Sequence, residues 1–325
     1  MSLRLSLRDV LAARETLAPH LPPVPLRPSL AAPGLDLRLK LECWQPTGSF
    51  KVRGALNLLA SLDLPALRAG LVAASAGNHA LGVAWAAQRL GGAAATLFVP
   101  HSAPQAKLAR LRTYPVTVRE AGFSYDETAA VADAFARDTG ATFVHPYEDV
   151  RTAAGQGTTA LEILDALPAP AAVLVPVGGG GLLAGVATVV KALSPRTRVL
   201  AVQPEASPAL RESLRLGRAL LTFPAAPTLA DGLAGGIGQI AFDHRDLVDE
   251  VVTVSEAQIE QAMVDLLAAD QVVAEASAAV TVAAARAGGL AGAGPVVAVL
   301  TGGNVDARVL ARLLAARYPE AGAPS

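Results

Sequence analysis

The chain has 325 residues, of which 52% are hydrophobic and 17% are charged, a composition that suits a packed core and not a disordered chain. Its formal net charge is −1 and no lysine or arginine block interrupts it, which argues against nucleic acid or an anionic membrane surface as partners. The length favours two domains, and a small molecule is the expected ligand.

The first residues and the cysteine content bear on the location of the protein. Residues 1–15 carry charges throughout and lack a continuous apolar stretch, so we expect no signal peptide. The single cysteine, Cys43, excludes an intrachain disulfide and fits the cytoplasm. Residues 171–190 are uncharged, but four successive glycines divide them into two short halves, so we predict no membrane span.

From about residue 71 onward, short apolar runs alternate with helical patterns. The first predicted strands are residues 70–75, 95–100, 116–120 and 142–146, with helices near 78–90, 104–113 and 125–138. After a helix near 153–167, the same rhythm gives strands at 171–177, 198–204, 250–254 and 295–301, with helices ending near 193, spanning 255–270 and following 302. Ser255 and Gln258 stand at capping-box spacing. The alternation predicts an α/β protein with two parallel sheets.

The glycine run at residues 178–181 lies between a predicted strand and a predicted helix. Backbone amides of such a turn can point at a phosphate, and the helix dipole favours the negative charge. Gly179, Gly181 and Ala184 also match the G-x-G-x-x-A pattern of dinucleotide sites, with Glu205 at a suitable distance. A glycine turn that only lets strand and helix pack closely is a third interpretation. The motif alone leaves all three open.

Lys51 lies in the tight motif QPTGSFKVRGA, residues 45–55. A desolvated lysine amine is a good nucleophile toward an aldehyde, whereas the alternative is a solvated lysine before a helix. A cofactor with both an aldehyde and a phosphate would use Lys51 and the glycine run together. Pyridoxal phosphate has both groups, so the two motifs jointly point to this cofactor.

A third motif follows the first predicted strand, where a helix is expected to begin. Its amides and short side chains could hold a carboxylate, and Asn78 could hydrogen-bond a ring hydroxyl. The alternative for Asn78 is a simple helix N-cap. His79, like the other histidines, has no metal-ligand spacing around it, so no metal is predicted. The motif consists of Ser75, Ala76, Gly77, Asn78 and His79.

Six ordered motifs together resemble the fold-type II pyridoxal-phosphate enzymes, specifically the threonine/serine dehydratase and serine racemase group. They are PTGSFKVRGA, SAGNHALGVA, AAGQGTTALEI, VPVGGGGLLAG, TLADGLA and LTGGNVD, and the likeness runs from about residue 40 to 306. This resemblance implies a tryptophan synthase β-like fold with two open parallel-sheet domains. A small domain at residues 63–148 would be inserted into a large domain formed by residues 1–62 and 149–325. We also expect a homodimer.

The resemblance assigns roles to individual residues. Lys51 would bind the cofactor aldehyde, Phe50 would pack against its ring, Asn78 would bond its phenolic oxygen and Thr301 would face its pyridine nitrogen. The phosphate would be cradled by Gly178, Gly179, Gly180 and Gly181. The substrate carboxylate would be lined by Ser75, Ala76, Gly77 and His79, with residues 153–157 as a turn across the cleft.

Two departures from the family pattern stand out. Cation-binding members carry a glutamate and an aspartate where this chain has Gln203 and Ala209, so we predict no metal site. Around Glu275 the lysine, proline and glycine of typical dehydratases are replaced, which could alter substrate choice; these positions hold Gln271, Ala276 and Ala278.

The predicted function is that of an ammonia-lyase, which converts a β-hydroxy amino acid to a 2-oxo acid and ammonia. Threonine and serine are the first candidates, and phenylserine or 3-hydroxyaspartate are alternative substrates. A serine racemase is disfavoured because Ala76 stands where racemases carry a serine. An NAD-linked oxidoreductase or a non-catalytic amino-acid-binding protein would leave Lys51 unexplained. Because the sequence ends soon after its last motif, we expect no regulatory domain and no feedback control by isoleucine.

Overall fold

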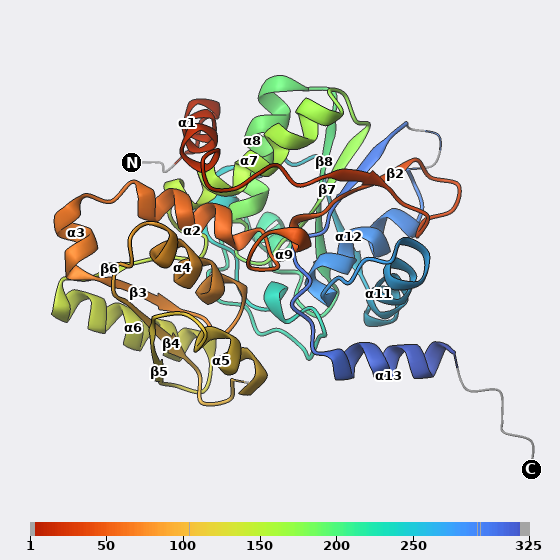
Figure 1. Ribbon diagram of the computed structural model, residues 1–325. Helices are drawn as coiled ribbons and strands as arrows, with labels where there is room; N and C mark the ends of the chain where they lie inside the picture. The colour runs from red at the N-terminus through yellow and green to blue at the C-terminus, as the bar shows by residue number, and fades with distance from the viewer. Residues whose placement is uncertain (1–3, 104, 291, 293, 319–325) are drawn as a thin grey trace, which may run out of the picture.

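The computed structural model describes residues 4–103, 105–290, 292 and 294–318, and these residues form two β-sheets flanked by helices (Figure 1). The larger sheet has the order β1-β2-β10-β7-β8-β9 and contains β1 (Leu26–Pro28), β2 (Leu37–Lys40), β7 (Ala172–Pro176), β8 (Arg198–Pro204), β9 (Glu250–Val254) and β10 (Val296–Val299). The smaller has the order β5-β4-β3-β6 and contains β3 (Leu71–Ala74), β4 (Ala95–Val99), β5 (Thr117–Glu120) and β6 (Thr142–Phe143). Described neighbours pair in parallel except β1, which is antiparallel to β2. The predicted α/β class is confirmed.

Both faces of the larger sheet are covered because its central strands are apolar on both sides. Val173 and Val175 pack on one face, whereas Leu174 packs on the other. The first face carries α1 (Leu7–Leu17), α7 (Val150–Ala166), α8 (Gly181–Leu193), α9 (Ala209–Leu216) and α10 (Gln239–Asp243). The second carries α11 (Glu256–Asp270), α12 (Ala276–Arg286) and α13 (Ala307–Arg317). Near-continuous hydrophobic runs are typical of such buried parallel strands.

The smaller sheet is also covered on both faces. Leu71 and Ala73 share a core with α2 (Lys51–Ala60), α4 (Asn78–Arg89) and α5 (Gln105–Leu111), whereas Val72 and Ala74 pack with α6 (Tyr125–Thr139). The helix α3 (Leu64–Ala69) precedes β3, and the short 3-10 helices are η1 (Glu42–Trp44), η2 (Asp231–Leu233) and η3 (Arg245–Leu247). The helix predicted at 104–113 corresponds to α5, and position 104 lies outside the described residues.

The predicted capping box of α11 is present: Ser255 Oγ accepts a hydrogen bond from the Gln258 amide at 3.4 Å, and Gln258 Oε1 accepts from the Ser255 amide at 2.8 Å. The capping box fixes the start of α11, as the spacing of these two residues indicates.

The predicted turn at residues 153–157 is wrong, because this segment lies inside α7. A Cβ placed on Gly155 would lie 2.6 Å from Arg53 O, and one on Gly157 would lie 3.0 Å from Gly185 O. The two glycines therefore serve close packing of α7 against α2 on one side and α8 on the other. A glycine in a helix lowers helix propensity but lets two backbones approach.

The helix α2 joins the two parts of the structure. Its apolar residues belong to the core of the smaller sheet, while its sequence lies before the predicted start of the small domain at residue 63. The boundaries predicted at 62/63 and 148/149 stay predictions. No described helix is both long enough and apolar enough to cross a lipid bilayer. Residues 171–190 form β7, the glycine turn and α8.

Candidate active site

A cavity of about 750 Å³ lies at the carboxyl ends of strands from both sheets. Parallel α/β sheets bind their ligands at this edge, because loops after neighbouring strands converge there. The lining includes every site residue predicted from the sequence: Phe50, Lys51, Ser75, Ala76, Gly77, Asn78, His79, Gly178, Gly179, Gly180, Gly181 and Thr301. The structure thus brings together residues from distant parts of the chain.

Lys51 is the first residue of α2, and its amine reaches into the cavity. Its Nζ donates a hydrogen bond to Pro146 O at 3.2 Å and lies 5.2 Å from the centre of the Phe50 ring. Burial lowers the pKa of the Lys51 amine to about 8, and this effect outweighs the opposite influence of Glu275. A lysine with this pKa is a much better nucleophile at neutral pH than an exposed one.

The segment before Lys51 is tied to the loop after β10. The amide of Phe50 donates to Thr301 O at 2.9 Å, and Ser49 pairs with Gly302 in an isolated antiparallel bridge. These contacts place Phe50 and Thr301 next to each other at the cavity wall. Lys51 is therefore held at its N-terminal side by backbone pairing and at its C-terminal side by α2.

The glycine run forms a narrow turn before α8. Gly180 has a φ of +86°, which favours glycine, and a Cβ there would lie 2.3 Å from the Ala241 Cβ. A Cβ on Gly179 would lie 2.2 Å from the Tyr147 ring, and one on Gly178 would lie 2.7 Å from Gly232 O. Side chains would fill this cradle, so glycine is needed throughout. The first-turn amides of α8 lack intrahelical acceptors and can bind an anion.

Asn78 begins α4, and its amide group has a defined orientation. Its Nδ2 donates to Glu275 Oε1 at 2.7 Å, and its Oδ1 accepts from Asn304 Nδ2 at 2.6 Å. One Nδ2 proton is left for a further acceptor, since an amide nitrogen has two. Ser75 Oγ accepts from the Gly77 amide at 3.1 Å, which shapes the loop before α4.

His79 takes a different role from the one that its position suggests. Its Nε2 donates to Val144 O at 2.7 Å, because a carbonyl oxygen can only accept. Burial, followed by the positive charge of Lys51, lowers the pKa of His79 to about 3, so the ring is neutral. The side chain is thus directed to the backbone of residue 144. The amide of His79 in the first turn of α4 is the group suited to a carboxylate.

The sequence profile of a family described as pyridoxal-phosphate dependent enzyme matches residues 17–302. This chain belongs to that family. An L-threonine ammonia-lyase from Geobacter sulfurreducens is 42% identical over 283 residues, which cover 85% of this chain and 69% of that protein. The crystal structure of a bacterial-type threonine deaminase is 41% identical and superimposes with a TM-score of 0.86, covering 93% of this chain and 99% of the other. Maize serine racemase is 32% identical with a TM-score of 0.89, covering 96% and 98%.

These comparisons confirm the predicted family, the fold class, the enzymatic nature of the chain and the pyridoxal phosphate cofactor. The cavity fits that cofactor. A cradle that only glycines keep open can accept the phosphate, and the Lys51 amine with its lowered pKa can accept the aldehyde. Asn78 presents a proton of Nδ2 for the phenolic oxygen.

Three cavity residues escaped the sequence-based list of site residues. The Tyr147 ring lies against Gly179, and its hydroxyl is hydrogen-bonded to that of Tyr125. Arg110 on α5 donates to Asn304 and to Thr47 O, so it ties the small-sheet side to the loop after β10. The HPYED segment after a predicted strand was a usable signal for Tyr147, because strand ends converge on the site. Arg110 had no such signal.

Gln203 holds the position where cation-binding relatives were expected to carry a glutamate. Its Oε1 accepts from the Leu210 amide at 2.9 Å, and its Nε2 donates to Val177 O at 3.2 Å. The fully buried amide is thus used to fix the start of α9. Among the residues that the structure describes, no cluster of three or more His, Cys, Asp or Glu side chains could hold a metal ion.

Proposed function

We propose that this chain is an ammonia-lyase that converts a β-hydroxy amino acid, with threonine as first candidate and serine as second, to a 2-oxo acid and ammonia. The observation that carries the proposal is the joint position of Lys51 and the glycine cradle in one cavity. Relatives at about 40% identity named as threonine ammonia-lyase or threonine deaminase support it. Bound pyridoxal phosphate supplies the electron sink that makes the α-proton of an amino acid removable.

Lys51 would hold the cofactor aldehyde and then act as the base. With a pKa of about 8, about a quarter of the Lys51 amines are neutral at pH 7.5, against about 0.1% for a lysine at 10.5. The neutral amine can take up the α-proton at Nζ. Phe50 packs beside it and limits access of water.

The other predicted residues would bind and orient. The amides of residues 75–79 form the carboxylate site at the start of α4, where the helix dipole favours negative charge. Asn78 would hold the phenolic oxygen, and its orientation is fixed by Glu275 and Asn304. Thr301 would offer a neutral hydroxyl to the pyridine nitrogen. A hydroxyl does not keep that nitrogen protonated as a carboxylate would, which favours prompt loss of the β-hydroxyl over racemisation.

The alternative functions are supported to different degrees. Membership of the pyridoxal-phosphate family removes the reason for an NAD-linked oxidoreductase, and the basic amine of Lys51 argues against a mere binding protein. A racemase needs an acid or base on the face opposite Lys51, and Ala76 offers no exchangeable proton there. The altered residues beside Glu275 keep phenylserine and 3-hydroxyaspartate as test substrates.

The decisive experiment combines product assay and covalent trapping. Purified enzyme is incubated with L-threonine, L-serine, phenylserine and 3-hydroxyaspartate, and release of 2-oxo acid and ammonia is measured. Borohydride reduction followed by peptide mapping should place the pyridoxyl group on Lys51. Lys51→Ala should abolish product release, whereas Lys191→Ala at the far end of α8 should leave it unchanged. A label on another lysine, or on none, would contradict the site.

Further expectations complete the proposal. We propose a cytoplasmic homodimer without nucleic-acid or membrane partners, because the net charge is −1 and the single cysteine needs no oxidising compartment. We also keep the division into a large domain, residues 1–62 and 149–325, and an inserted domain at 63–148. Light scattering of the purified chain tests the dimer, and limited proteolysis near the two boundaries tests the division.

A further inference from the structure

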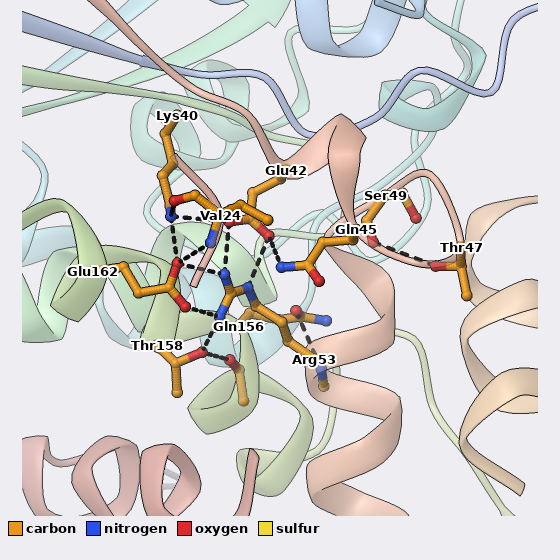
Figure 2. A network of polar contacts seen from close by, with 12 residues as sticks. Val24, Lys40, Glu42, Gln45, Thr47, Ser49, Arg53, Gln156, Thr158 and Glu162 are labelled. Carbon is orange, nitrogen blue, oxygen red and sulfur yellow. Dashed lines mark hydrogen bonds and ion pairs between the residues drawn. The ribbon is translucent and has the colours of Figure 1, made fainter. Parts of the chain in front are cut away.

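A cluster of buried charges lies behind the active-site lysine (Figure 2). It contains two cations and two carboxylates, so its formal charges balance. Lys40 comes from β2, Glu42 from η1, Arg53 from α2 and Glu162 from α7. The Lys40, Glu42 and Arg53 side chains are at most 2% exposed, and that of Glu162 is 15% exposed. Burial of four charges needs close pairing, because unpaired charges in an interior are strongly unfavourable.

Arg53 is at the centre of this cluster, and it uses all five of its N–H donors. Its Nε and Nη2 donate to the two Glu42 oxygens, both at 2.8 Å, while Nη1 and Nη2 donate to the two Glu162 oxygens at 2.7 and 2.8 Å. Nη1 also donates to Thr158 Oγ1 at 3.1 Å. Two bidentate pairs fix the guanidinium in position and in orientation, which a single point charge could not do.

Lys40 completes the cluster from the edge of the larger sheet. Its Nζ donates to Glu162 and to Val24 O, and it lies 3.7 Å from Glu42 Oε1. Figure 2 shows Lys40 and Arg53 on either side of Glu162. Lys40 itself belongs to β2 and makes no contact of this cluster with the α2 backbone. Arg53 is therefore the member that transmits the cluster to α2.

Arg53 and Lys51 are two positions apart on one helix. Since successive helical residues are rotated by about 100°, the two side chains project to nearly opposite sides of α2. Lys51 enters the cavity, while Arg53 points into the cluster. The cluster consequently holds the back of the helical turn whose front carries the reactive amine.

The helix that receives Arg53 also supports the glycine cradle. Gly155 of α7 touches α2, since a Cβ there would lie 2.6 Å from Arg53 O. Two residues later, Gly157 touches α8, and a Cβ on Gly185 of α8 would lie 2.6 Å from Ala153 O. The first turn of α8 contains Gly181 of the cradle. One helix, α7, therefore sets the position of both Lys51 and the phosphate site.

We propose that Arg53 is a positioning residue, which locks the first turn of α2 to β2 and α7 and thereby holds the Lys51 amine at a fixed place relative to the glycine cradle. The proposal rests on the proposed role of Lys51. A role in stability alone is a weaker account, since well-packed apolar residues often replace buried ion clusters without loss of stability. Positional precision is what two opposed bidentate pairs supply.

The test replaces Arg53 by lysine, which keeps the charge but cannot form both forks. Full-length wild-type and Arg53→Lys proteins are freed of cofactor, mixed with pyridoxal phosphate, and sampled by borohydride trapping with peptide mapping. We expect incorporation at Lys51 to slow at least tenfold. Binding of pyridoxine 5′-phosphate, which carries the phosphate but no aldehyde, should change less than twofold when followed by fluorescence. In the reconstituted enzyme kcat should fall at least tenfold, with KM within twofold.

Lys40→Met is the matched control, because it damages the same cluster away from α2. We expect it to lower the thermal midpoint at least as much as Arg53→Lys does, yet to change incorporation at Lys51 less than threefold. Equal slowing in both variants would overturn the proposal and assign the effect to lost stability. Wild-type incorporation in Arg53→Lys would overturn the proposal alone, whereas an unlabelled Lys51 in the wild type would overturn the proposed function with it.

Discussion

Replacing Lys51 by methionine should stabilise the cofactor-free protein at neutral pH, because folding buries an amine that prefers to be charged in water. Burial lowers the pKa of Lys51 from 10.5 to about 8. Each pKa unit corresponds to about 1.4 kcal/mol, so the shift is equivalent to about 3 kcal/mol of lost folding free energy. Part of the side chain faces the cavity, where water reduces this loss. We therefore expect Lys51→Met to gain about 2–3 kcal/mol.

The pH dependence gives the sign of this effect. Between pH 8 and pH 10.5 the unfolded chain binds more protons at Lys51 than the folded one, so wild-type stability rises with pH in this window. The gain of Lys51→Met should thus be complete below pH 8 and should vanish above pH 10.5. Urea unfolding of both cofactor-free proteins at pH 7 and pH 10.5 measures it, and groups that titrate in both proteins cancel in the difference.

A second lysine provides the control for this measurement. Lys191 pairs with Asp249 at 2.6 Å and donates to Thr197 O at 2.9 Å near the protein surface. Lys191→Met should give no gain and should lose about 1 kcal/mol or less at pH 7. The reasoning fails if Lys51→Met brings no gain at pH 7, or if its gain persists unchanged at pH 10.5.

Three other predictions concern the cradle, the reaction outcome and the metal. Gly180→Ala should weaken pyridoxal phosphate binding at least tenfold in a fluorescence titration, because its Cβ would lie 2.3 Å from the Ala241 Cβ; Gly217→Ala, at φ +68° in open space, should leave binding unchanged. With L-serine, pyruvate should form much faster than D-serine on chiral chromatography, and Ala76→Ser should raise D-serine; comparable wild-type rates would speak against the assignment. Activity should survive EDTA because Gln203 offers no carboxylate, and a loss restored by magnesium would contradict this.

The strands of both sheets were predictable where their local pattern was strong. The runs that became β7 and β8 were recognised to within one or two residues, because buried parallel strands are almost continuously apolar. The helix α12 was not recognised, since it is alanine-rich and buried on all sides, which leaves no polar face to produce a helical period. The short strands β1 and β2 were missed because their identity depends on pairing with each other and with β10.

The site was predictable where its residues directly follow strands or begin helices. Lys51 and the glycine run carry their chemistry in local motifs, and the convergence of strand ends brings them together. The cluster around Arg53 carried no such pattern, because Glu162 is 109 positions away in the chain. Its single local hint was the placement of Lys40 and Glu42 within an otherwise apolar run, where isolated charges require buried partners.

The two sides of α2 are held by forces of different character, and this difference has a consequence for substrate binding. Arg53 holds one side through directional bidentate pairs, whereas Leu56 and Leu59 pack on the other side into the core of the smaller sheet. Apolar contacts are non-directional and tolerate small sliding, while two opposed forks do not. We therefore expect any movement of the smaller sheet to occur between α2 and α4. Lys51 would then stay fixed on the cradle, while the carboxylate site at the start of α4 closes toward it.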